Sequence, residues 1–307
     1  MNVIDHHQGR NFGAYHCDTV EFTAELPDAS IDHSVYSPPF SSLYIYSESE
    51  RDMGNVGSDE EFQACYRHLV RELFRVTKPG RLTAIHVKDL VFYSNSSEKG
   101  DRGLRDFSGD CIRTHLQEGW TYHRRITINR CPVHEMQKTK SDRLLYKNFR
   151  TDAARTGGGL PEYLLVFRKW ADGMEDVPPV LHDPAEFPLE RWQQLAQPVW
   201  MTDGTWFDTR ETDVLNVKVA RDAEAEKHLC PMPLDITGRS IEQYSNPGET
   251  IYSPFMGIGS EGYVSIRKGR RFIGTELKES YFRQAVKYLS EAERLGISND
   301  LFTGVAA

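Results

Sequence analysis

A glycine-rich turn between two predicted strands near the C-terminus constrains the fold more than any other feature. The run Ser253–Ser260, with sequence SPFMGIGS, follows a short predicted strand over Glu249–Tyr252 and opens a predicted helix. Phe255, Gly257 and Gly259 give it an F-x-G-x-G pattern. Glycines let the backbone approach a nucleoside closely, and the helix N-terminus that follows presents positive charge. The pattern indicates a wound α/β sheet with a cofactor site, although a tight turn alone would also explain it.

An acidic residue after the next strand favours the cofactor interpretation. Glu276 ends a predicted strand over Arg271–Thr275 and lies 17 residues after Gly259. A carboxylate in this position can accept hydrogen bonds from both hydroxyls of a ribose. Strand, turn, helix, strand and acid together predict a site for an adenosine-containing cofactor. The alternative is a glutamate exposed on the surface.

A second chemical motif lies near the N-terminus. The predicted strand Ile31–Tyr36 ends in Ser37, Pro38, Pro39 and Phe40. Ligand sites of α/β sheets lie at such strand ends. Two prolines fix the backbone and lack N–H donors, so the local polar groups are mainly acceptors. Acceptors beside a flat apolar ring suit the exocyclic amino group of a base, whereas the alternative is a proline-rich turn with a buried phenylalanine.

The rest of the chain alternates helices and strands, which is typical of an α/β sheet. A capping box at 58–61 precedes apolar residues at helical spacing from Phe62 to Phe74. Lys78–Gly80 is expected to end that helix. The other predicted strands are 81–87, 122–129 and 162–169, and the other predicted helices are 110–117, 233–244 and 280–295.

Composition excludes several classes of protein. The 307 residues are 39% hydrophobic and 27% charged, which suits a globular chain with a large core. No apolar run is long enough to span a membrane, and the polar N-terminus lacks a signal-peptide core. The five cysteines show neither paired spacing nor a zinc pattern. We therefore expect a cytoplasmic protein without a metal or a disulfide framework.

Charge is distributed unevenly along the chain. The net charge is −8, yet residues 124–169 carry a local charge of +7 and residues 170–215 one of −8. A basic block can bind phosphates, although a solvated surface is the alternative. The candidate phosphate-binding residues are Arg130, Lys138, Lys140, Arg143, Lys147 and Arg150.

With the motif at Ser37–Phe40 placed before the motif at Phe255–Gly259, the chain resembles the DNA amino-methyltransferases of the permuted β-class. The resemblance covers most of the chain. It implies a Rossmann-like α/β methyltransferase sheet in circularly permuted motif order, with S-adenosylmethionine as the cofactor. It also implies a bacterial or phage-infected host cell as the setting, and double-stranded DNA as the partner.

The resemblance also implies roles for individual residues. Ser37, Pro38, Pro39 and Phe40 would form the catalytic motif. Cofactor-binding residues would be Asp18, Lys227, His228, Pro231, Phe255, Gly257, Gly259 and Glu276. The segment that includes Lys227, His228 and Pro231 corresponds to the one that wraps the methionine end of the cofactor. One departure stands out, because Ser253 occupies the place where the family usually has an aspartate.

Three regions follow from the motif order. Residues 1–170 are expected to form the catalytic half, 171–216 a small target-recognition insert and 217–307 the cofactor-binding half. Trp192, Trp200 and Trp206 could fill a small core in the insert. The residues that contact base edges would then lie in 171–216, while the residues of the basic block bind phosphates.

The motif also bears on the target base. In the family, a serine in the catalytic motif favours cytosine at its N4 atom, while adenine N6 stays open. Methylation of cytosine at carbon 5 is disfavoured. That reaction needs a nucleophilic cysteine, typically after a proline, and no cysteine of this chain follows a proline. Methylation of RNA or of a protein amide, a non-enzymatic DNA-binding module and a nicotinamide oxidoreductase are weaker alternatives. A homodimer and a cognate restriction endonuclease also stay open.

Overall fold

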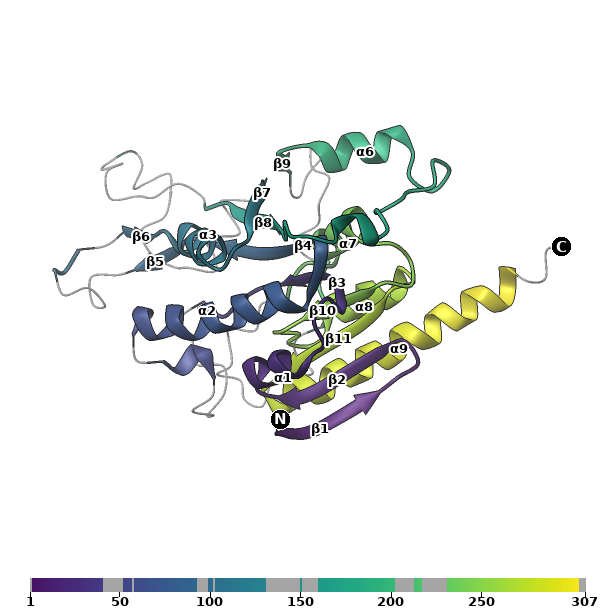
Figure 1. Ribbon diagram of the computed structural model, residues 1–307, viewed down its shortest axis with the longest axis horizontal. Coiled ribbons are helices and arrows are strands. Elements are labelled where there is room, and N and C mark those ends of the chain that lie inside the picture. The colour runs from purple at the N-terminus through teal and green to yellow at the C-terminus, as the bar shows by residue number, and fades with distance from the viewer. Residues whose placement is uncertain are drawn as a thin grey trace.

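A mixed β-sheet forms the centre of the computed structural model, which describes residues 2–40, 52–56, 58–92, 99–101, 103–130, 150, 160–201, 213–216 and 231–303. Within these ranges the sheet has nine strands in the order β1-β2-β11-β10-β3-β4-β8-β7-β9 (Figure 1). Their bounds are β1 Val3–Gln8, β2 Phe12–Cys17, β3 Ile31–Tyr36, β4 Thr77–Lys88, β7 Thr121–Ile128, β8 Glu162–Arg168, β9 Val199–Trp200, β10 Thr250–Ser253 and β11 Arg271–Glu276. A separate hairpin pairs β5 (Leu90–Phe92) with β6 (Gly103–Arg105).

The middle of the sheet is parallel and interleaves the two ends of the chain. Strands β2, β11, β10, β3 and β4 all run in the same direction. In this arrangement Phe272 pairs with Phe12, and Ile251 pairs with His33. Strands β3 and β10 are therefore neighbours, although more than 200 residues separate them in the chain. The predicted Rossmann-like α/β sheet is confirmed, and its order explains how the two motifs meet in a permuted chain.

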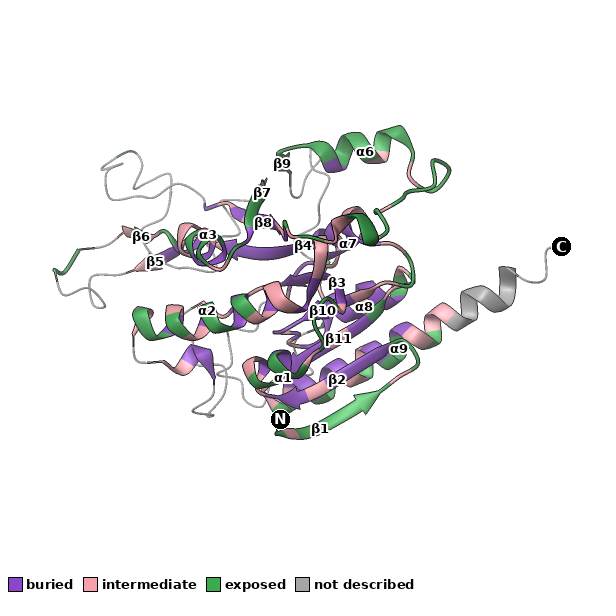
Figure 2. Cartoon of the chain, viewed as in Figure 1, coloured by how far each residue is buried: buried purple, intermediate pink, exposed green. Residues whose placement is uncertain are grey.

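Helices cover both faces of the sheet. Helices α1 (Thr19–Glu25), α2 (Asp59–Val76) and α3 (Phe107–Gln117) lie on one face, while α7 (Leu234–Tyr244), α8 (Ser260–Arg267) and α9 (Glu279–Thr303) lie on the other (Figure 1). Each face buries a separate group of apolar side chains against its helices. Figure 2 shows the central strands buried and β1 exposed at the edge. Strand β3 is buried at every position, including its polar residues Asp32, His33 and Ser34, as expected for a parallel strand covered on both faces.

Helix α2 shows how closely local sequence sets an element. Ser58 accepts a hydrogen bond of 3.2 Å from the backbone N–H of Glu61, as the capping box predicts. The predicted apolar stripe is buried, from Phe62 to Leu73. Helix α2 ends at Val76, just before Lys78–Gly80, but β4 begins at Thr77, four residues earlier than the predicted strand 81–87. Its pairing with β3 shifts register over this stretch, where Gly80 has a φ of +76°.

The described part of the expected insert joins the main sheet. Strand β9 pairs with β7, and Trp200 is fully buried in the core beneath α7. The Arg239 guanidinium lies 5.0 Å from the centre of the Trp200 ring. Trp192, on helix α6 (Leu189–Ala196), is exposed, and Trp206 lies outside the described residues. The two described tryptophans, Trp192 and Trp200, therefore do not form a separate core of the insert.

Within the described residues, no helix combines the length with the apolar composition that a membrane crossing requires.

Candidate active site and cofactor cavity

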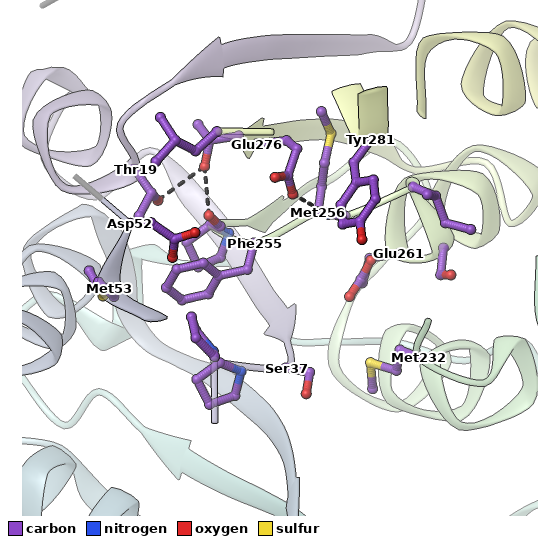
Figure 3. A pocket seen from close by; sticks show the side chains of 18 of the residues that line it. Thr19, Ser37, Asp52, Met53, Met232, Phe255, Met256, Glu261, Glu276 and Tyr281 are labelled. Carbon is purple, nitrogen blue, oxygen red and sulfur yellow. Dashed lines mark hydrogen bonds between the residues drawn. The ribbon is translucent and has the colours of Figure 1, made fainter. Parts of the chain in front are cut away.

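A cavity lies at the carboxyl ends of the parallel strands β2, β3, β10 and β11 (Figure 3). Such strand ends form the usual ligand crevice of an open α/β sheet. The cavity brings together both predicted motifs. The predicted site residues that line it are Asp18, Ser37, Pro38, Pro39, Phe40, Pro231, Phe255, Gly257 and Glu276.

The remaining predicted cofactor residues lie elsewhere. Gly259 lies between two residues of the cavity wall, Ile258 and Ser260, and is the N-cap of α8 with a φ of +93°. A Cβ atom there would lie 3.2 Å from the Cβ of Ala285, so only glycine fits without strain or displacement of α9. Lys227 and His228 lie outside the described residues.

The predicted catalytic motif, Ser37–Phe40, directly follows strand β3 and lines the cavity. The Ser37 hydroxyl donates a hydrogen bond of 2.9 Å to the backbone carbonyl of His86 on β4. Since its proton is committed to that bond, the Ser37 oxygen can act toward the cavity only as an acceptor. Phe40 is partly buried, and its ring packs edge-on against Phe107 at a centroid distance of 6.1 Å. The motif thus presents an acceptor and an aromatic ring, as the sequence predicts.

The end of strand β4 beside Ser37 is fixed by a buried polar cluster. The His86 side chain lies 2.7 Å from a carboxylate oxygen of Glu162 on β8, and Arg130 forms an ion pair of 2.5 Å with the same oxygen. Burial alone would raise the pKa of Glu162, but His86 and Arg130 together hold it well below the usual range. The cluster therefore anchors the strand end that receives the Ser37 hydrogen bond.

The glycine turn is held in shape by strand β11. The Thr275 hydroxyl lies 2.8 Å from the carbonyl oxygen of Pro254 and 3.0 Å from the hydroxyl of Thr19 (Figure 3). A carboxylate oxygen of Glu276 accepts a hydrogen bond of 2.9 Å from the backbone N–H of Gly257. Gly257 has a φ of +53°, and its missing side chain leaves the backbone open to a close ligand.

Glu276 faces the cavity with a perturbed ionisation. Burial, together with the nearby charge of Asp52, raises the pKa of Glu276 to about 7. Hydrogen bonds from the backbone of Lys278 and Gly257 oppose this rise. A carboxyl held by backbone donors at a cavity wall is suited to accept hydrogen bonds from vicinal hydroxyls.

Asp18 directly follows strand β2, the neighbour of β11 in the sheet, and it has two roles there. It caps helix α1, where one carboxylate oxygen accepts hydrogen bonds of 2.9 Å from the backbone N–H groups of Val20 and Glu21. It also lines the cavity. Its position is consistent with the expected place beside the adenosine of the cofactor.

Sequence reasoning missed other residues of the cavity wall: Asp52, Met232, Glu261 and Tyr281. Glu261 is the most unusual, because it is 3% exposed and its burial raises its pKa to about 8. In the sequence, an acid near the start of a helix is typical of a surface residue that favours the helix dipole. Only the packing of α8 against the sheet shows that this carboxyl faces a cavity.

The predicted DNA contacts are mostly not described. Lys138, Lys140, Arg143 and Lys147 lie outside the described residues, and Arg150 is exposed. The Arg130 side chain is only 9% exposed and is paired with Glu162. Its contact with DNA phosphates therefore stays a prediction, and the structure gives it an internal partner instead.

Solved structures with the same fold include two DNA methylases. The putative DNA modification methylase TTHA0409 of Thermus thermophilus, complexed with S-adenosyl-L-methionine, aligns at 20% identity over 90% of this chain and 91% of its own, with a TM-score of 0.65. The cytosine-N4-specific PvuII DNA methyltransferase aligns at 14% identity over 95% of both chains, with a TM-score of 0.62.

Sequence relatives point to the same class. M.MthZI of Methanothermobacter thermautotrophicus, a type II methyltransferase, is 24% identical over 90% of this chain and 76% of its own. M1.MboII of Moraxella bovis, also a type II methyltransferase, is 36% identical, but that match spans 22% of this chain and 25% of the relative. The DNA adenine methyltransferase YhdJ of Escherichia coli is 36% identical over 22% of this chain and 24% of its own.

The fold and the cavity define a methyltransferase that uses S-adenosylmethionine. Residues 31–287 match the DNA methylase model of the N6/N4 methyltransferases, and the chain belongs to this family. The resemblance inferred from the two motifs is confirmed, and so is the cofactor.

Proposed function

We propose that this protein transfers a methyl group from S-adenosylmethionine to an exocyclic amino group of a base in double-stranded DNA, with cytosine N4 as the favoured target. The observation that carries the proposal is the Ser37 oxygen, which faces the cofactor cavity as an acceptor because its proton is bound to His86. In the family, serine at this position favours cytosine.

The cofactor would lie between the glycine turn and the catalytic motif. Glu276 would accept hydrogen bonds from the ribose, Asp18 would lie beside the adenosine, and Phe255 and Gly257 would line its path. The bound cofactor supplies an electrophilic methyl group. The fit of these residues is supported by the wall of acceptors and by the open backbone at Gly257.

The chain's own residues would orient the target base. Base flipping costs a few kcal/mol, roughly what is recovered by stacking and hydrogen bonding in the pocket. Ser37 and the Pro38 carbonyl would accept the amino hydrogens, so that the nitrogen lone pair points at the methyl group. Phe40 would stack on the flipped ring, a contact of about 1–3 kcal/mol. Alignment of the amino group with the methyl group then supplies much of the rate.

Adenine N6 is the second candidate. YhdJ, a relative over 22% of this chain, is named as a DNA adenine methyltransferase, whereas PvuII methyltransferase, similar in fold, is named as specific for cytosine N4.

The type II relatives also support a cognate restriction endonuclease as partner. A homodimer is a further expectation, to be checked by light scattering.

Mass spectrometry of nucleosides separates the candidates. Purified protein is incubated with S-adenosylmethionine and mixed-sequence duplex DNA, and the DNA is then digested to nucleosides. N4-methylcytosine is the expected product, and the Phe40→Ala variant serves as the inactive control. N6-methyladenine would overturn the choice of base, whereas methylated RNA in a parallel incubation, with the DNA left unmethylated, would overturn the proposed substrate.

A further inference from the structure

Glu261 places a carboxyl group in the cofactor cavity without an assigned role. It is the second residue of α8, directly after Gly259 and Ser260, and it is 3% exposed. Figure 3 shows its carboxyl projecting into the cavity, between Tyr281 and Met232 in this view. A carboxyl buried in this way needs a compensating partner.

The protein supplies no such partner within its described part. Among the described residues no lysine or arginine acts on the Glu261 carboxyl, which accepts a hydrogen bond from its own backbone N–H. Burial and the nearby Glu276 raise the pKa of Glu261 to about 8. Without a cation beside it, this carboxyl is therefore largely a neutral acid at pH 7.

The cavity as a whole is suited to a cation. Its described wall contains four carboxyl side chains and no lysine, arginine or histidine, and the four are Asp18, Asp52, Glu261 and Glu276. S-adenosylmethionine carries two positive groups, a sulfonium and an α-ammonium. Either would favour the ionised form of a buried carboxyl next to it.

The positions of neighbouring residues favour the α-ammonium over the sulfonium as the group beside Glu261. Glu276 lies at the ribose end, and Ser37–Phe40 must lie at the methyl group. Glu261 lines the wall together with Met232, which directly follows Pro231. Pro231 belongs to the segment expected at the methionine end, and so that end is the part of the cofactor left for Glu261.

The altered cofactor motif gives an independent reason. Ser253 stands where the family usually has an aspartate, and it neither lines the cavity nor finds a hydrogen-bond partner for its hydroxyl among the described residues. A carboxyl eight residues later, on the cavity wall, restores an acid to this loop and helix.

We infer that Glu261 binds the α-ammonium group of the cofactor's amino-acid end, an inference that rests on the cofactor placement proposed above. The carboxylate pairs with the ammonium where water is excluded, and the pair compensates the burial of both charges. Binding of the cofactor thus ionises Glu261 and expels its proton.

Calorimetry with three ligands tests this assignment. The probes are S-adenosylmethionine, S-adenosylhomocysteine and a deaminated S-adenosylhomocysteine, in which hydrogen replaces the α-amino group. Glu261→Gln keeps the size of the side chain and removes the charge. It should weaken binding of the first two ligands by about 10- to 100-fold and leave the third unchanged. The wild-type protein should bind S-adenosylhomocysteine more tightly than its deaminated form by a similar factor.

Two matched variants complete the design. Glu279→Gln, on α9 and paired with Arg283, is exposed and should leave all three affinities unchanged. Glu276→Gln should weaken all three ligands, because each carries the ribose. Thermal unfolding without ligand shows whether each variant is folded.

The outcomes separate this inference from the proposed function. Equal wild-type affinity for S-adenosylhomocysteine and its deaminated form would overturn the role of Glu261, whether or not the variant folds. So would a Glu261→Gln effect of the same size on all three ligands, or one confined to S-adenosylmethionine, which would place the carboxylate at the sulfonium. A wild-type protein that binds none of the ligands would overturn the cofactor placement itself.

Discussion

The hydroxyl of Ser37 donates a 2.9 Å hydrogen bond to the backbone carbonyl of His86, on the neighbouring strand β4. The bond fixes which way the hydroxyl points before any substrate enters. Its oxygen is then a ready acceptor at the cavity wall, and no reorganisation is needed at the moment of reaction. Glu162 pairs with Arg130 and with the His86 side chain, and these contacts stabilise the position of the His86 backbone that accepts the Ser37 hydrogen bond.

Removal of the Ser37 hydroxyl should slow methyl transfer and leave cofactor binding intact. Ser37→Ala deletes one acceptor for the amino group, so we expect turnover to fall by roughly tenfold. Single-turnover transfer of a labelled methyl group measures the step directly. Ser30→Ala, just before the same strand, is the matched control and should keep wild-type turnover.

Loss of the Phe40 ring should have a larger effect. Phe40→Ala removes the face on which the flipped base stacks, and the expected loss is about 10- to 100-fold in turnover. Phe40→Tyr keeps the ring and should restore most of the rate. Affinity for S-adenosylmethionine should hardly change, and wild-type turnover in Phe40→Ala would mean that the active site lies elsewhere.

Glu276→Ala should weaken cofactor binding without unfolding the chain. The variant loses the acceptors for the ribose and the support of the Gly257 N–H. We expect affinity for S-adenosylmethionine to fall by about 10- to 100-fold in calorimetry. Unchanged affinity would contradict the assignment of the ribose site.

The raised pKa of Glu261 predicts how stability depends on pH. In the unfolded chain this carboxyl ionises near pH 4.5, whereas in the empty folded protein it ionises near pH 8. Between these values the folded state binds the extra proton, so its contribution to stability falls as pH rises. Glu261→Gln removes this penalty and should stabilise the ligand-free protein by about 4 kcal/mol at pH 8, since one pKa unit corresponds to about 1.4 kcal/mol. At pH 4 the two proteins should be equally stable in thermal unfolding, and a constant difference across this range would count against the prediction.

The basic block and the insert should affect DNA binding in different ways. Replacing Lys138, Lys140, Arg143 and Lys147 by glutamine should weaken binding to every DNA sequence and reduce the salt slope by roughly 0.9 per lost phosphate contact.

Exchange of 171–216 for a relative's segment should change which sites are methylated, as read by long-read methylation mapping. If the methylated sequence is unchanged after the exchange, target recognition lies outside 171–216, and the basic block becomes the better candidate.

Arg130 shows why contacts in the tertiary structure cannot be read from charge alone. The sequence places it at the head of a basic block, so a phosphate contact was the natural prediction. In the structure its guanidinium is paired with Glu162, a residue 32 positions later on the adjacent strand β8. The pairing of β7 with β8 brings the two charges together, and no local pattern encodes that distance.

The sequence by itself determined the fold class and both halves of the site. Alternation of strands and helices, the proline pair after β3 and the glycines after β10 are local requirements of backbone geometry, and local requirements can be read in a linear chain. The tertiary structure alone decided that β3 and β10 lie side by side, that Trp200 belongs to the main core and that Glu261 faces the cavity. These features depend on which distant segments pack together, and the burial of apolar surface that drives packing acts without regard to their separation along the chain.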